Sequence, residues 1–155
     1  MKTITDQTFA PIFCAWMMKE LDMAHPFGPE TRYIAFCDVN EKGELEIGTC
    51  TALNTWSQGA CEAHIASTRS TKKADAEYIY TVFDYAFRHA DVNCMTTNVA
   101  TTNTKSIRLQ ERLGFKRVGL VEGFYGPDED AYFFSITKQQ WLDGKWGSSD
   151  PEGVI

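Results

Sequence analysis

The most informative stretch of the sequence is Asn103-Thr104-Lys105-Ser106-Ile107-Arg108-Leu109-Gln110-Glu111-Arg112-Leu113-Gly114-Phe115. Asn103 and Thr104 stand where the first turn of a helix needs a capping side chain. Gly114 can take the positive φ with which helices commonly end, and Phe115 then begins an extended segment. The stretch therefore predicts a short helix over residues 104–113 that leads directly into a strand.

Outward from this stretch, the apolar pattern alternates between strand spacing and helix spacing. Strands are expected at residues 2–5, 31–39, 44–54, 60–67, 92–99, 115–122 and 131–137. Helices are expected at residues 8–22, 72–89, 104–113 and from Lys138 onward. Hairpins thus come first and crossover helices follow, which predicts a mixed α/β (α+β) layer fold.

The chain has 155 residues, of which 43% are apolar and 23% are charged, as is typical of one globular domain. We expect that domain over residues 1–143 and a flexible tail over residues 144–155, which are rich in Gly, Ser and Asp. No apolar run is long enough for a membrane span, and no secretory signal is visible. The five cysteines form no C-x-x-C pair, which favours reduced thiols over a zinc site or a disulfide framework.

The charge is unevenly distributed along the chain, although the net value is only −6. Nine basic and five acidic side chains lie within residues 69–117, whereas acidic side chains outnumber basic ones nine to four before this segment and seven to two after it. The acidic majority argues against a nucleic-acid partner, because such binding needs a basic surface. The basic middle is explained either by ordinary solvated surface or by a site for one anionic ligand.

The stretch 103–115 resembles the N-x-x-S/A-x-x-x-x-x-x-x-G-F signature of the GCN5-related N-acetyltransferases, the GNAT superfamily. Ser and Glu follow Asn103 by three and eight residues, as in the branch that acetylates the N-termini of ribosomal proteins. Further likenesses to this branch are found at Gly119, Asp130 and residues 132–136, and likenesses to small phage-encoded members at residues 62–66 and 83–87. The order of the expected elements matches the superfamily over about residues 1–142.

The resemblance implies a mixed, mostly antiparallel central sheet of about six to seven strands flanked by helices. It also implies an N-acetyltransferase that uses acetyl-CoA as co-substrate, without a metal, and acts on a primary amine of a small molecule, a protein N-terminus or a lysine. The expected location is the cytoplasm, which for a phage-encoded protein is that of the host. No membrane or nucleic-acid partner is expected, and the resemblance allows a homodimer.

The superfamily binds the phosphates of CoA with a loop of pattern Q/R-x-x-G-x-G/A before a long helix, as suits an anion at a helix N-terminus. The corresponding residues here are Arg69, Ser70, Thr71, Lys72, Lys73 and Ala74. Lys72 stands where the first Gly of the pattern is expected, and it lacks the backbone freedom of Gly. Its ammonium group could contact a phosphate directly, or the segment is an ordinary polar helix start.

Attack by an amine requires a group that accepts its proton, and we assign Glu62 to this role with His64 as its partner or substitute. The two residues are two apart on one expected strand, so both point to the same face. The alternatives are an exposed strand carboxylate and a structural histidine. The aromatic and apolar residues Trp16, Met17, Phe27 and Trp56 either line the acceptor pocket or belong to the core.

The departing thiolate needs a proton, which many GNAT enzymes supply from a Tyr seven residues after the motif Asn. Gln110 occupies that position and cannot act as an acid. In the branch that the chain resembles, the motif Ser is placed near the sulfur, so Ser106 is the candidate donor, with Tyr125 and Tyr132 as substitutes. Asn103 and Ser106 are also expected to contact the cofactor, against the simpler reading that they cap and pack the helix.

Two departures from the family pattern, Lys72 and Gln110, leave a second hypothesis open. A GNAT-shaped phage accessory or virion protein with a degenerate CoA loop would share the fold without catalysis. The basic middle segment and the retained Asn103, Ser106 and Arg69 favour the enzyme. Acyl donors other than acetyl-CoA also remain compatible with the sequence.

Overall fold

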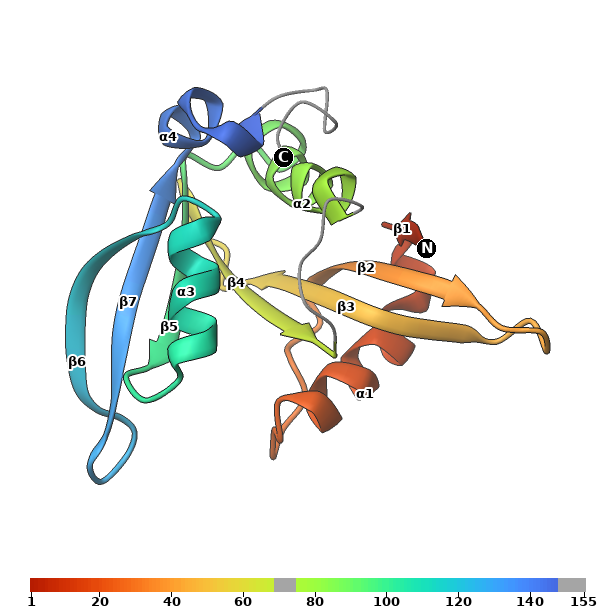
Figure 1. Cartoon of the computed structure of the whole chain (residues 1–155), viewed down its shortest axis with the longest axis horizontal. Coiled ribbons are helices and arrows are strands. Elements are labelled where there is room, and N and C mark those ends of the chain that lie inside the picture. Colours follow the sequence, from red (N-terminus) through yellow and green to blue (C-terminus); the bar gives the residue numbers. More distant parts are fainter. Residues whose placement is uncertain (69–74, 148–155) are drawn as a thin grey trace.

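The computed structural model describes residues 1–68 and 75–147, and its centre is a seven-stranded sheet with the order β1-β2-β3-β4-β5-β7-β6. The strands are β1 (Lys2–Ile4), β2 (Arg32–Val39), β3 (Leu45–Asn54), β4 (Ala60–Ser67), β5 (Cys94–Ala100), β6 (Lys116–Gly126) and β7 (Glu129–Thr137). Every neighbouring pair is antiparallel except β4 and β5. The expected mostly antiparallel sheet of six to seven strands is therefore confirmed (Figure 1).

Helices cover both faces of this sheet. They are α1 (Ala10–Glu20), α2 (Ala76–Asp84), α3 (Thr104–Arg112) and α4 (Lys138–Asp143), with the short turns η1 (Gln7–Phe9), η3 (Tyr85–His89) and η4 (Lys145–Gly147). Phe13 and Met17 of α1 are fully buried in a cluster with β2 and β3, while α2 places Phe83 in a second cluster on the opposite face. Figure 1 shows α1 and α2 on opposite sides of β2 and β3.

The strands β4 and β5 separate after a short common stretch. They pair from Ala60 with Cys94 only as far as Glu62 with Thr96, whereas β4 continues to pair with β3 as far as Ser67. In an antiparallel pair, alternate residues direct their backbone groups away from the partner. Some backbone N–H groups of β4 beyond Glu62 therefore point into the gap between β4 and β5, which Figure 1 shows as a fork.

The last hairpin differs from its expected form. A loop was predicted between residues 122 and 131, but β6 extends to Gly126 and only Pro127 and Asp128 separate it from β7. The pairing passes from Val121 with Ala131 to Gly126 with Glu129, so residues 122–125 bulge opposite a single residue. Gly123 therefore lies in a bulge within β6, and Gly126 pairs with Glu129 at the end of the strand.

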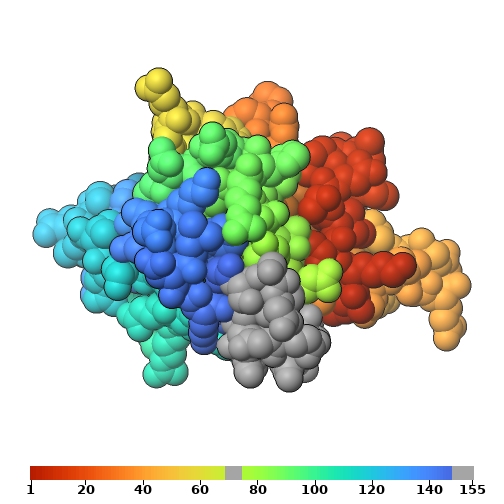
Figure 2. Space-filling model, turned by 90° about the horizontal axis from the view of Figure 1, so that it is seen from above, coloured from red at the N-terminus to blue at the C-terminus, as the bar shows by residue number. Residues whose placement is uncertain are grey.

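The C-terminal end also differs from expectation, because a loose tail was predicted from Gly144. Residues 145–147 form η4, and Trp146 is only 3% exposed. Its indole N–H donates to the Arg112 carbonyl at 2.9 Å, and its own carbonyl accepts from Trp141 at 2.8 Å. Packed structure therefore continues to Gly147, where η4 contacts α2 and α4. Figure 2 shows the last described residues, in blue, packed against the green segment that contains α2, while residues 148–155 lie outside the described part of the chain.

Candidate active site

A cleft of about 740 Å³ opens where β4 and β5 part. A groove of about 640 Å³ adjoins it and runs along α3 beside the outer end of β4. The residues that line both spaces are Leu21, Ile65, Asn103 and Ser106. Cleft and groove therefore meet at the gap between the strands, so that a long ligand in the groove can present one end to the cleft.

Glu62 and His64 lie side by side in this cleft, on one face of β4 as their spacing predicted. His64 Nε2 is 3.0 Å from Asn54 Oδ1 and 3.4 Å from Glu62 Oε1. Because both of these atoms accept, Nε2 carries the hydrogen. Burial, aided by the Phe27 ring at 4.9 Å, lowers the pKa of His64 below its ordinary value, and the Glu62 charge offsets this only in part. The imidazole is therefore neutral at pH 7.

The Glu62 carboxylate is held on one of its two oxygens. Asn98 of β5 donates its Nδ2 hydrogen to Oε1 at 2.9 Å, and His64 approaches the same oxygen. The Tyr125 hydroxyl of β6 in turn donates to Asn98 Oδ1 at 2.6 Å. Among the described residues, these contacts leave Oε2 of Glu62 to accept a proton from a bound molecule.

The motif residues at the start of α3 lie at the junction of cleft and groove. Asn103 Oδ1 accepts from the Ser106 backbone N–H at 3.1 Å, so Asn103 caps the helix, as the simpler interpretation predicted. Ser106 lines both spaces. Gln110 is only 3% exposed, and its Oε1 accepts from the Thr97 hydroxyl at 2.8 Å. This amide therefore ties α3 to β5 at the position where an acid would be expected.

One wall of the groove is basic. Lys105, Arg108 and Arg112 of α3 line it, opposite Glu20 and Leu21 at the end of α1. The expected phosphate loop, Arg69, Ser70, Thr71, Lys72, Lys73 and Ala74, lies outside the described residues. The cationic face of α3 is thus the part of the basic middle segment that the structure places at a ligand-sized space.

A family model described as an acetyltransferase (GNAT) domain matches residues 31–140, which is more than half of the chain. The chain belongs to the GNAT acetyltransferase family. Family membership and the N-acetyltransferase relatives support an acyltransferase enzyme, and they give no support to the non-catalytic alternative.

The relatives differ in how much they share with this GNAT chain. The uncharacterized N-acetyltransferase p20 of Bacillus licheniformis is 28% identical over 104 residues, which make up 65% of this chain and 51% of that protein. The chain therefore spans about half the length of this curated relative. The comparisons show neither the ribosomal-protein branch nor the phage-encoded members.

Solved structures show the same fold. A spermidine N-acetyltransferase SpeG chimera from Vibrio cholerae and hSSAT has a TM-score of 0.69 at 16% identity, covering 92% of this chain and 99% of that chain. The spermidine/spermine N-acetyltransferase SpeG of Vibrio cholerae in complex with manganese ions has a TM-score of 0.66 at 15% identity, covering 92% and 94%. At such low identity, the likeness establishes the GNAT fold alone.

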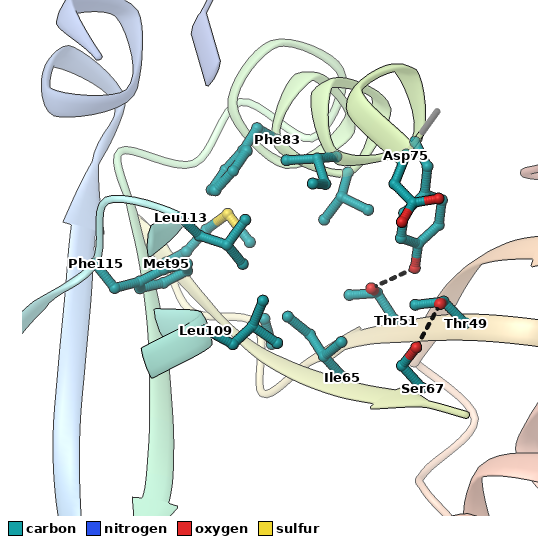
Figure 3. A pocket seen from close by; sticks show the side chains of 14 residues that line it. Thr49, Thr51, Ile65, Ser67, Asp75, Phe83, Met95, Leu109, Leu113 and Phe115 are labelled. Carbon is teal, nitrogen blue, oxygen red and sulfur yellow. Dashed lines mark hydrogen bonds between the residues drawn. The ribbon is translucent and has the colours of Figure 1, made fainter. Parts of the chain in front are cut away.

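Below the groove of this GNAT fold lies a small apolar cavity of about 50 Å³ between α2, α3 and the parting strands. Figure 3 shows Ile65 and Leu109 on one side of it and Phe83 on the other, with the Thr49–Ser67 hydrogen bond at its edge. A space of this size corresponds to roughly one or two water molecules. The cavity is therefore too small for a long acyl chain.

The four residues proposed for an acceptor pocket are divided between cleft and core. Phe27 lines the cleft, while Met17 is fully buried and Trp16 packs against the same cluster. Trp56 packs against the core under α2, and its indole donates to the Glu30 carbonyl at 3.0 Å. Of the two alternatives, the core therefore accounts for Trp16, Met17 and Trp56 and the cleft for Phe27, because aromatic spacing alone cannot separate a core stripe from a pocket lining.

Sequence reasoning missed two residues of the site, Asn54 and Asn98. Asn54 is hydrogen-bonded to His64, and Asn98 to Glu62, but neither asparagine belongs to a sequence motif. The sequence offered little signal, because each is one of several polar residues in its strand. Within residues 1–68 and 75–147, no group of three or more His, Cys, Asp or Glu could hold a metal ion, and no helix is long and apolar enough to span a bilayer.

Proposed function

We propose that the chain is an N-acetyltransferase that moves an acetyl group from acetyl-CoA to a primary amine by direct attack through a tetrahedral intermediate. The observation that carries the proposal is the Glu62 carboxylate, held through Oε1 in the cleft that adjoins the groove. The amine enters the cleft, and the thioester reaches it from the groove. This arrangement brings the two reactants together at the gap between β4 and β5.

The first step forms the carbon–nitrogen bond. Glu62 Oε2 accepts a proton from the amine as nitrogen attacks the thioester carbonyl, because only a neutral amine is nucleophilic. Neutral His64 donates toward Oε1 and so steadies the carboxylate. The oxyanion that forms accepts from a backbone N–H of β4 beyond Glu62, one of those freed by the parting of the strands.

The second step breaks the carbon–sulfur bond. As the intermediate collapses, the thiolate of CoA leaves and takes a proton from the Ser106 hydroxyl, which regains one through water from the protonated Glu62 carboxyl. Ser106 suits this role because it lines both the cleft and the groove. Tyr125 is less suitable, because its hydroxyl hydrogen is engaged by Asn98. Tyr132 does not line the cleft, and the Arg117 guanidinium lies 3.8 Å from the centre of its ring.

The groove suits a donor that carries phosphates. Lys105, Arg108 and Arg112 offer positive charge along α3, and Lys105 lies in its first turn, where the helix N-terminus favours anions. The loop Arg69–Ala74 is assigned to the pyrophosphate on the family pattern, with Lys72 as a direct charge contact in place of Gly. Acetyl is the favoured acyl group, because the apolar cavity beside the groove is small.

The acceptor is a cationic amine, which the acidic residues Asp128, Glu129 and Asp130 in the cleft lining attract before it loses its proton. Since similar structures are named spermidine N-acetyltransferases, polyamines are the first amines to test. Protein N-termini, as in the ribosomal-protein branch, and lysine side chains come next. We place the activity in the cytoplasm, whether of a cell or of a phage host, in one domain and as a monomer or homodimer.

Acetyl-CoA stabilises the folded chain in a thermal melt, by about 2.7 kcal/mol at 100 times its dissociation constant. Lys105→Glu raises that constant about tenfold, because it reverses a charge that lines the groove. The matched control is Lys42→Glu, which makes the same change in the turn between β2 and β3 and leaves the dissociation constant unchanged.

Release of free thiol with a panel of polyamines, lysine peptides and N-terminal peptides then identifies the acceptor. No stabilisation by millimolar acetyl-CoA and no thiol release would refute the proposal.

Ser106→Ala lowers kcat about 10- to 100-fold while the KM for acetyl-CoA stays nearly constant, because the lost hydroxyl acts on the departing thiolate. Steady-state kinetics by thiol release measure both constants. Ser57→Ala serves as the control, since Ser57 lies in the turn before β4 and bonds only locally. An unchanged kcat would remove Ser106 from the mechanism and leave the enzyme assignment intact.

A further inference from the structure

The bulge of β6 brings a side chain across an intervening strand. The sheet order places β7 between β5 and β6, so a residue of β6 is two strand spacings, roughly 10 Å, from β5. Tyr125 nevertheless reaches Asn98 of β5 with a hydrogen bond of 2.6 Å. A flat, regular strand would not direct a side chain over its neighbour in this way.

The bulge is itself held in place. Gly123 has a φ of +67°, which favours glycine, and its N–H donates to Asp130 Oδ1 at 2.8 Å. Phe124 packs edge-on against Phe133 of β7, with ring centres 5.1 Å apart. The two residues before Tyr125 are therefore anchored to β7, which fixes the direction in which the Tyr125 ring extends over the cleft.

The polarity of Asn98 is determined by its two partners. A carboxylate can only accept, so Nδ2 must face Glu62 and Oδ1 must face Tyr125. Without the Tyr125 hydroxyl, the amide loses one of the two contacts that define this orientation. The amide carries no transferable proton at neutral pH, so the Tyr125–Asn98–Glu62 chain orients the carboxylate and does not conduct protons.

We propose that Tyr125 is a positioning residue, whose hydroxyl holds the Asn98 amide so that Asn98 fixes Oε1 of Glu62 and leaves Oε2 for the amine. This inference rests on the proposed function and adds a residue that no motif of the sequence marks for it. The residue is supplied by the last hairpin, which forms the outer edge of the sheet.

Kinetics of the full-length protein test this series of hydrogen bonds from Tyr125 through Asn98 to Glu62. Tyr125→Phe keeps the ring and lowers kcat about 3- to 10-fold, the effect of one hydrogen bond, while Asn98→Ala lowers it about 10- to 100-fold. The double variant is no slower than Asn98→Ala alone, because Tyr125 acts through Asn98. Tyr85→Phe, whose ring packs on His89 away from the cleft, leaves kcat unchanged.

An NMR titration of the three histidines gives a readout that needs no turnover. In Tyr125→Phe and Asn98→Ala, the released Glu62 carboxylate can close its 3.4 Å gap to His64, so the His64 midpoint rises. The proposal is overturned if that midpoint stays in place, or if the two single variants add in the double variant. An inactive wild type would refute the proposed function, and the titration would still decide whether Tyr125 positions Glu62.

Discussion

Glu62→Gln lowers kcat by about 10²- to 10⁴-fold, because the amide cannot accept the proton that the attacking amine must lose. The fold stays intact, since the Gln carbonyl oxygen can still accept from Asn98. Thermal stabilisation by acetyl-CoA is also retained, because the groove is unchanged. Steady-state kinetics combined with a thermal melt therefore separate loss of the base from loss of cofactor binding.

The pH dependence of this variant distinguishes a base from a binding residue. Without a base, the reaction depends on amine that is already neutral, so the rate of Glu62→Gln rises toward the pKa of the amine, about 10 for a lysine-type group. Glu46→Gln, an exposed carboxylate of the neighbouring β3, is the control and leaves kcat at the wild-type value. A Glu62→Gln enzyme with wild-type kcat across the pH range would show that water or another group accepts the proton.

Much of the fold could be predicted from the sequence because its signals are local. The capping residue Asn103 and the ending residue Gly114, with its φ of +97°, bound α3 as expected. The period-two pattern placed Glu62 and His64 on one face of β4. In each case a few consecutive residues contain the whole cause, so no knowledge of the remaining chain was needed.

The rest of the site depends on strand register, which the sequence does not display. Asn54, Glu62, Asn98 and Tyr125 come from four strands, and they meet only because β3 to β5 pair in one particular register and β6 bulges. The bulge depends on the contact from Gly123 to Asp130. A glycine near a Gly-Pro turn is typical of a loop, so its role within a strand could not be predicted from spacing alone.

Trp146→Ala destabilises the folded chain by about 3–5 kcal/mol, as expected for truncation of a large buried ring. In a chain of this length the change lowers Tm by about 10 °C or more. The ring is 3% exposed, and its N–H donates to the Arg112 carbonyl at the end of α3, where the last carbonyls accept no hydrogen bond from within the helix. Because α3 also carries Ser106 and Lys105, the residues beyond the expected domain end support the candidate site.

Two further variants separate ring packing from the hydrogen bond in urea-unfolding measurements. Trp146→Phe keeps most of the buried surface and costs only about 1–3 kcal/mol, the penalty of losing the hydrogen bond from the indole to the Arg112 carbonyl. Trp16→Ala is the matched control, because that indole is only partly buried on α1, and it costs less than half as much as Trp146→Ala. Equal losses of unfolding free energy for Trp146→Ala and Trp16→Ala would contradict the prediction. They would mean that Trp146 of η4 stabilises the domain no more than a partly buried side chain of α1 does.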